Sequence, residues 1–198
     1  MIDKELINKY ILINTPEELL EFMSTNINYG YLGKNNKIYY YGDEDFDKDW
    51  YSEYILESKD EILRTGIGNC WDQTELERSW FLENNYEIKT VYVMVNLDYE
   101  NNYPTHSFLT YKNKDNNGWN WFENSDFDNR GIHRFQSFNE LIKYRLDKYK
   151  SLLKRFNVSE EELSNITMKV FSQPNSNCSV KEYIDFVISS DISIDVDI

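Results

Sequence analysis

Cys70 has the local context that most favours nucleophilic chemistry. It follows the turn-forming segment TGIGN, residues 65–69, and begins a stretch of helical periodicity that extends to residue 84. The partial positive charge and free N–H groups at a helix start stabilise a thiolate and can bind an oxyanion. Asn69 and Trp71 are therefore expected to line a site around this thiol, and the simpler interpretation of Trp71 is a core residue beside that site. The competing interpretation is a small buried cysteine in a helix core.

A candidate base and a candidate orienting carboxylate lie on two predicted strands. His106 is near the start of the extended segment 105–111, and Glu123 ends the segment 119–123. Short turns between such segments favour antiparallel pairing, which would bring both side chains to the same end of a sheet. His106 would then take the Cys70 proton, and the carboxylate would fix its tautomer. Taken alone, each residue also has an ordinary structural interpretation.

Other residues compete for these roles. His133 is the main rival to His106, in a segment interpreted as a loop, and Cys178 precedes the last predicted helix in a polar turn. Tyr29 and Tyr31 lie in the turn-rich segment 28–33. One of their hydroxyls would assist an oxyanion if that loop covers the site, and otherwise both are ordinary turn tyrosines.

The elements that must position these residues follow from caps and periodicity. Thr15 with Glu18, and Ser58 with Glu61, have capping-box spacing and predict two helix starts. The acidic run 43–49 is interpreted as a solvated loop. Helices, then strands with short turns, then helices predict an α+β domain. Beyond the nucleophile helix, the predicted strands are 38–41, 88–97, 105–111, 119–123 and an edge strand 168–171, and the later predicted helices are 138–156, one from Ser159, and 179–189.

These motifs together resemble the transglutaminase-like superfamily. The resemblance rests on Gly68-Asn69-Cys70-Trp71-Asp72 with its helix, His106 opening a strand, and Trp121-Phe122-Glu123 on the next. Within the superfamily the chain is similar to a bacterial group of small proteins with a Cys-Trp-Asp and Pro-Thr-His pattern. The resemblance covers roughly residues 61–138 and leaves the first fifty residues and the C-terminal helices unexplained.

The resemblance implies a papain-like fold, with the nucleophile helix packed on an antiparallel sheet and flanking helices. It also implies a Cys–His–acid triad that attacks a peptide or protein amide and ends in hydrolysis or acyl transfer. The third residue of the family is usually Asp, whereas this chain has Glu123 followed by Asn124-Ser125-Asp126. Glu123 is the preferred third residue, and Asn124, as in papain, and Asp126 remain alternatives. A catalytically inactive member that binds a protein partner is the alternative function.

Composition limits the other possibilities. The 198 residues fit one domain, 1–198, with a core at about 58–138 and helical decorations at both ends. A net charge of −14 disfavours nucleic acid and anionic membranes as partners. No secretory signal or membrane span is recognised, so a cytoplasmic location is expected. Two cysteines and two histidines make a disulfide scaffold and structural zinc improbable, and no metal or cofactor is expected. The sequence does not predict an oligomeric state.

Overall fold

The computed structural model describes residues 4–95, 103–115, 117–190 and 194. Helices and strands alternate in blocks along this part of the chain, as expected for an α+β fold. The helices are α1 (Lys4–Ile11), α2 (Pro16–Asn26), α3 (Phe46–Glu53), α4 (Lys59–Thr65), α5 (Cys70–Glu83), α6 (Phe138–Lys154), α7 (Glu160–Leu163) and α8 (Val180–Ile188). The strands are β1 (Gly30–Leu32), β2 (Ile38–Tyr40), β3 (Ile88–Val95), β4 (His106–Lys112), β5 (Trp119–Glu123), β6 (Gly131–Phe135) and β7 (Ile166–Phe171).

The central sheet has the strand order β6-β5-β4-β3-β7, with antiparallel pairing throughout, and a separate hairpin pairs β1 with β2. In the β4–β5 pair, Leu109 faces Phe122 and Thr110 faces Trp121. This register brings the start of β4, which carries His106, to the end of β5, which carries Glu123. The strand at 166–171 lies at the sheet edge, as the sequence predicted.

Local signals in the sequence account for the helix boundaries. Thr15 and Ser58 form the predicted capping boxes with Glu18 and Glu61, at the starts of α2 and α4. Gly66 ends α4 in the left-handed conformation, with φ of 67°, which glycine adopts without steric cost. The chain can therefore reverse direction within a few residues and begin α5.

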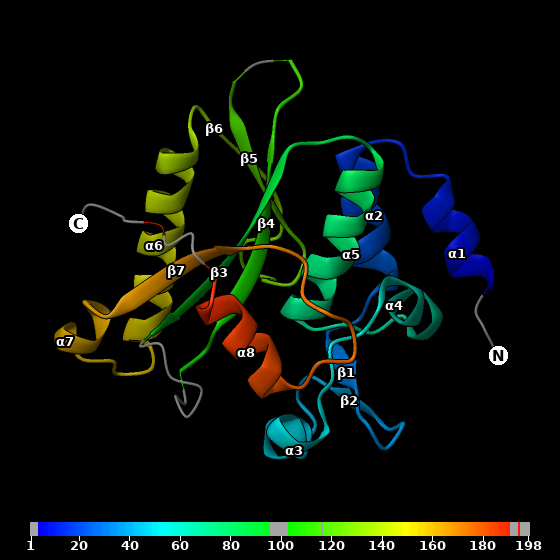
Figure 1. The fold of residues 1–198 in the computed structure, drawn as a ribbon, viewed down its shortest axis with the longest axis horizontal. Helices are drawn as coiled ribbons and strands as arrows, with labels where there is room; N and C mark the ends of the chain where they lie inside the picture. The colour runs from blue at the N-terminus through cyan, green and yellow to red at the C-terminus, as the bar shows by residue number, and fades with distance from the viewer. Residues whose placement is uncertain (1–3, 96–102, 116, 191–193, 195–198) are drawn as a thin grey trace.

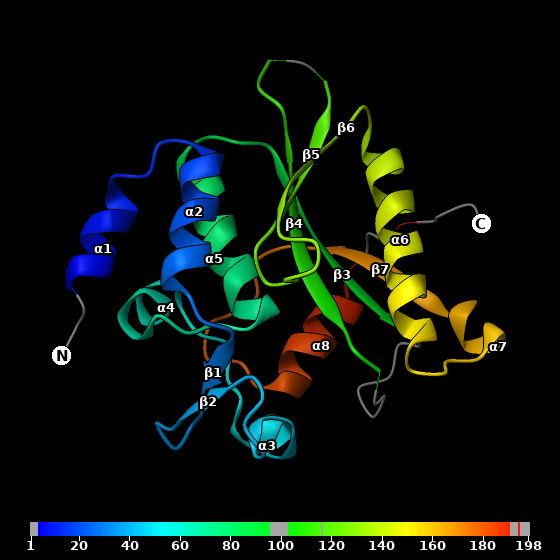
Figure 2. The ribbon, with the colours of Figure 1, turned by 180° about the vertical axis from the view of Figure 1, so that it is seen from behind.

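Helices cover both faces of the sheet (Figures 1 and 2). On one face α6 packs on β5 and β6, over a core that includes Val93, Phe108 and Trp121. On the other face α5 packs on β4 and β3, over a core that includes Leu109 and Phe122. Successive side chains of β4 and β5 point to opposite faces and are buried on both, so these strands contribute to both cores.

Four elements were missed by sequence analysis, namely α1, β1, α3 and β6. The acidic run 43–49 is not entirely loop, because α3 starts within it at Phe46. Phe46 and Trp50 are one helical turn apart, and both pack in the aromatic core around Tyr31 and Tyr54. Burial of these rings therefore outweighs the polar character of the segment. In a similar way, pairing with β5 makes residues 131–135 a strand, not a loop.

Candidate active site

Cys70 is the first residue of α5 and lies directly after its N-cap. The Asn69 side chain accepts hydrogen bonds from the backbone N–H groups of Trp71, at 2.7 Å, and Asp72, at 3.3 Å. Asp72 in turn accepts the Asn69 N–H at 3.0 Å, which completes a capping box. Asn69 thus supports the backbone of the site as the helix cap, and the Cys70 thiol is placed at the positive end of a 14-residue helix.

Asp72 also anchors this helix start to the segment before α4. Its Oδ1 accepts hydrogen bonds from the Tyr54 hydroxyl and the Glu57 backbone N–H, both at 2.9 Å. Asp72 is fully buried, and burial raises its pKa to about 7 despite the hydrogen bonds that oppose this shift. Three attachments to one carboxylate hold the N-terminus of α5 in a fixed position.

His106 and Glu123 meet at the end of the sheet, as the predicted hairpin requires. Nε2 of His106 lies 2.8 Å from Oε2 of Glu123, and Glu123 is only 2 % exposed. The same Oε2 accepts the Trp121 indole N–H at 3.2 Å, and Oε1 accepts the Ser125 hydroxyl at 2.9 Å and the Asp126 N–H at 2.8 Å. Four donors satisfy this carboxylate and fix its orientation toward the imidazole.

The electrostatics favour a charged His106. Burial alone would lower the pKa of His106, but the charge of Glu123 and hydrogen bonds with the Cys70 and Glu123 side chains raise it to about 10. Burial alone would also raise the pKa of Glu123, yet the His106 charge and hydrogen bond, followed by Arg145 and the Asp126 N–H, lower it to about 2. The pair is therefore an imidazolium and a carboxylate at neutral pH.

The two alternative third residues have other partners. Asn124 is buried, and its Nδ2 donates to Oε1 of Gln73 on α5 at 2.7 Å. The Asp126 carboxylate accepts from Asn129 at 2.8 Å, and only its backbone N–H reaches Glu123. Of the three candidates, Glu123 is the one that hydrogen-bonds to His106 in the described structure.

Tyr29 covers Cys70. Burial, then the charge of Cys70 and a hydrogen bond with its thiol, raise the pKa of Tyr29, and the Cys70 backbone N–H opposes this rise. A parallel bridge between Asn28 and Ile67 places Tyr29 there, because it joins the segment before β1 to the turn before α5. Cys70 is 7 % exposed under this cover.

Tyr31 and Trp71 lie in the core. The Tyr31 hydroxyl donates to the Phe46 carbonyl at 3.0 Å, and its ring stacks on Tyr39 at 4.7 Å. Trp71 stacks on Tyr183 with ring centroids 4.1 Å apart and is 2 % exposed. The sequence analysis had placed both residues at the site, and the structure assigns both to the aromatic core beneath it.

The rival nucleophile and base are placed elsewhere. Nε2 of His133, on β6, donates to the Asn129 carbonyl at 2.7 Å. The His133 ring stacks on Trp121 with the ring centroids 4.4 Å apart. Burial, followed by the charge of Glu182, raises the pKa of Cys178 to about 11, which disfavours a thiolate at that position.

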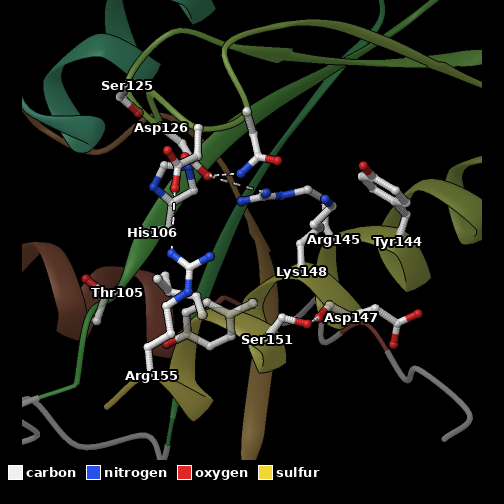
Figure 3. Close-up of a pocket in the computed structure, with 14 residues that line it drawn as sticks. Thr105, His106, Ser125, Asp126, Tyr144, Arg145, Asp147, Lys148, Ser151 and Arg155 are labelled. Carbon is white, nitrogen blue, oxygen red and sulfur yellow. Dashed lines mark hydrogen bonds and ion pairs between the residues drawn. The ribbon is translucent and has the colours of Figure 1, made fainter.

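Two cavities share the loop after β5 as a wall, and one reaches His106 while the other reaches Tyr29. The larger, of about 770 Å³, opens beside His106 and has one wall formed by α6, including Arg145 and Lys148 (Figure 3). The smaller, of about 320 Å³, is lined by Tyr29, Tyr41 and Phe127 together with residues of the loop. Within the described residues, no group of three His, Cys, Asp or Glu side chains could hold a metal ion.

Sequence analysis missed two residues next to the triad candidates. Arg145 lies on the apolar stripe of α6 with Leu141, Ile142 and Tyr149, and a basic residue in such a stripe is a detectable signal. Gln73 lies one turn after Cys70 and joins Asn124 to the Gly68 carbonyl. No feature of its position in the sequence indicates this bridge.

Replacing Tyr29 is expected to expose the thiol. Tyr29→Ala removes both the ring and the hydroxyl above Cys70, so we expect alkylation of Cys70 by iodoacetamide to accelerate about tenfold, since access limits a covered thiol. The rate is measured by mass spectrometry in a Cys178→Ser background. Tyr40→Ala, which removes an exposed ring from the neighbouring hairpin, is the control. An unchanged rate in Tyr29→Ala would show that Tyr29 does not limit access.

The fold and site define a class: an α+β domain in which a cysteine at a helix N-terminus lies beside a His–Glu pair on an antiparallel sheet. Residues 1–116, more than half of the chain, match the family model described as a transglutaminase-like domain. The chain belongs to this family. The matched region contains Cys70 and His106 and ends before Glu123.

No curated protein matched the sequence. Among the described residues, no helix has the length and apolar character needed to cross a lipid bilayer.

Proposed function

We propose that this protein is a cysteine-dependent enzyme that hydrolyses or transfers the acyl group of a peptide or protein amide. The observation that carries the proposal is the chain of contacts from Glu123 through His106 to Cys70 at the start of α5. A thiol, an imidazole and an orienting carboxylate in this order are the parts of a nucleophile activated by a neighbouring base.

Each residue has a separate role in the proposed reaction. Glu123 holds Nε2 of His106, which leaves Nδ1 to exchange a proton with the Cys70 thiol. The thiolate attacks the amide carbon, and the carbonyl electrons move to oxygen to form a tetrahedral oxyanion. As the C–N bond breaks, the imidazolium protonates the leaving nitrogen and a thioester remains on Cys70. Water, or an amine, then gives its proton to His106, attacks the thioester and releases the thiolate.

The Cys70 backbone N–H and the Tyr29 hydroxyl are the proposed oxyanion donors. The Cys70 backbone N–H lowers the pKa of the Tyr29 hydroxyl, which indicates that the two donors lie close together. A substrate carbonyl that lies between them would accept from both donors. A single such donor contributes on the order of 10²–10³ in kcat in enzymes of this type.

The larger cavity supports an amide with a substituted leaving nitrogen. His106 must lie beside that nitrogen to protonate it, and the cavity of about 770 Å³ opens on the His106 side. Ammonia, about the size of a water molecule at ~30 Å³, would use little of this space. A peptide or a protein amine therefore suits the cavity better.

Cys70 reactivity against pH tests the proposal. In a Cys178→Ser background, we expect iodoacetamide to alkylate Cys70 rapidly even at pH 6, where a free thiol with a pKa of about 8.5 is mostly protonated. His106→Ala removes the ion-pair partner, so the rate at pH 6 should fall about 100-fold. The raised pKa of His106, about 10, places the loss of the imidazolium at high pH, so acid catalysis should fall as the pH rises through that value.

A Cys70 that reacts as slowly as a free thiol, with the same pH profile in His106→Ala, would exclude the ion pair. If the ion pair is present, peptide amides are then screened for turnover, with Cys70→Ser as the inactive reference.

A binding module is the second candidate, and the cover over Cys70 favours it. Tyr29 closes the thiol, and the exposed rings of Tyr41 and Phe127 lie beside Tyr29, with centroids at 5.6 Å and 6.0 Å. Exposed aromatic rings are typical of interaction surfaces. Slow, His106-independent alkylation would favour this second function.

A further inference from the structure

Arg145 is a buried cation behind the candidate triad. It projects from α6 into the larger cavity, and Figure 3 shows it extending toward Asp126. Arg145 is 3 % exposed, and within the described structure its buried Nε has no hydrogen-bond partner. A buried charge is costly unless other groups compensate it. The position therefore requires a physical reason.

Besides the Phe108 ring at 4.8 Å, Arg145 contacts two of the four residues that donate to Glu123. Its guanidinium carbon lies 3.9 Å from the centre of the Trp121 ring, and its Nη1 lies 3.9 Å from Oδ2 of Asp126. Trp121 donates its indole N–H to Glu123, and Asp126 donates its backbone N–H to the other carboxylate oxygen. One guanidinium thus joins a side chain of β5 to the loop that follows β5.

The charges around Arg145 agree with this arrangement. Burial lowers the pKa of Arg145, while the carboxylates of Glu123 and Asp126 raise it. Arg145 in turn helps to lower the pKa of Glu123, after the larger effect of His106. Tyr144 also raises the pKa of Arg145, and Cys70 raises the pKa of His106 by hydrogen bonding. Glu123 in turn raises the pKa of the buried Glu77 and of Tyr29.

We propose that Arg145 is a positioning residue, which holds Trp121 and Asp126 against Glu123 and so keeps the carboxylate on His106. The inference rests on the proposed function, because it assigns Arg145 a role in the Cys70–His106–Glu123 arrangement. Arg145 acts through Glu123 and has no direct part in the transfer of the acyl group. The planar guanidinium is needed because it must stack on an indole and pair with a carboxylate at once.

The test follows the protonation of His106. The chain has two histidines, so ¹³C-labelled imidazoles give two resonances, which His133→Asn assigns. Arg145→Met keeps an apolar stem and removes the charge and the planar group. We expect the pKa of His106 to fall by at least one unit in this variant and the alkylation rate of Cys70 at pH 6 to fall about tenfold. A purely structural role would lower the melting temperature without lowering the pKa of His106, because loss of a nearby positive charge by itself raises that pKa.

Lys148→Met is the matched control. Lys148 lies on the same wall of the cavity, three residues along α6, and it lies over the Tyr144 ring at 5.4 Å. The Lys148→Met substitution removes one positive charge from the same cavity and leaves the contacts of Arg145 with Trp121 and Asp126 in place. We expect its His106 titration to match that of the wild type. A shift equal to that of Arg145→Met would overturn the inference, because any nearby cation would then suffice.

Arg145→Lys keeps the test decisive if the methionine variant does not fold. Lysine retains the buried charge but lacks the planar fork, so we expect the His106 pKa to fall in the same direction by a smaller amount. Wild-type titration curves in every folded Arg145 variant would overturn the inference. Because the titration does not need a reactive thiol, it is independent of the outcome for Cys70 that would exclude the proposed enzyme.

Discussion

Glu123→Gln is expected to lower the pKa of His106 from about 10 to 6.5 or below. Glutamine has nearly the same shape, and its amide oxygen can still accept from Ser125 and the Asp126 N–H. This orientation turns its NH₂ group toward His106 and also toward the Trp121 indole N–H, which loses its acceptor. A donor facing Nε2 disfavours the imidazolium and selects the tautomer protonated on Nδ1. That tautomer cannot take a proton from Cys70, so alkylation at pH 6 should fall about 100-fold.

The stability of Glu123→Gln gives a second measurement. The raised pKa of His106 stabilises the fold fully below pH 6.5, and this contribution is lost as the pH rises through about 10. The lowered pKa of Glu123 stabilises the fold fully above pH 4.5, and this contribution is lost as the pH falls through about 2. The loss in unfolding free energy, about 3–5 kcal/mol for one partner of a buried pair, should therefore be largest between 4.5 and 6.5.

Urea unfolding of the wild type and of Glu123→Gln across this pH range makes the comparison. Glu21→Gln, which neutralises an exposed carboxylate on α2, is the control and should leave both the His106 titration and the stability unchanged. A glutamine variant whose His106 still titrates near 10 would show that Glu123 does not hold the imidazolium.

Arg78→Met is expected to cost about 3–5 kcal/mol of unfolding free energy. Arg78 pairs with Glu75 through Nε at 2.9 Å and Nη2 at 3.1 Å, and the two side chains are 5 % and 6 % exposed. Its Nη1 also donates to the Phe171 carbonyl on β7, so this pair ties the nucleophile helix α5 to the sheet edge. Methionine retains the apolar stem and leaves the Glu75 charge buried without a cation.

The pH dependence and a double variant show whether an unpaired charge or lost packing causes the destabilisation of Arg78→Met. Burial raises the pKa of Glu75, and Arg78 opposes that shift. Without Arg78 the protonated acid is favoured further in the folded state, so the destabilisation should grow as the pH rises above 4.5. Glu75→Met combined with Arg78→Met removes both charges and should recover to within about 1 kcal/mol of the wild type. Failure of the double variant to recover would assign the loss to packing and not to an unpaired charge.

An exposed ion pair provides the contrast within the same molecule. Lys9 and Glu5 pair at 2.8 Å on α1, with side chains 51 % and 73 % exposed. Lys9→Met should change the unfolding free energy by less than about 0.5 kcal/mol, because water screens this pair. Urea unfolding followed by tryptophan fluorescence measures all of these variants.

The sequence by itself determined the helix that starts at Cys70 and the strand that starts at His106. Breaker residues before Cys70, the capping residues and the helical spacing after it are local signals, and they placed the thiol at the first residue of α5. The short turn between the extended segments 105–111 and 119–123 predicted the antiparallel pairing that brings His106 to Glu123. These features depend on neighbours in the chain, so a single sequence contains the information.

Tertiary structure decided which residues surround Cys70, His106 and Glu123. Tyr29 covers Cys70, and Tyr31 does not, because a backbone bridge from Asn28 to Ile67 fixes where each ring lies. Trp71 faces the core because Tyr183, more than a hundred residues later, supplies a stacking partner. Arg145 reaches Trp121 and Asp126 only after α6 packs on the sheet. Such contacts join segments far apart in the chain, and no local pattern determines their geometry.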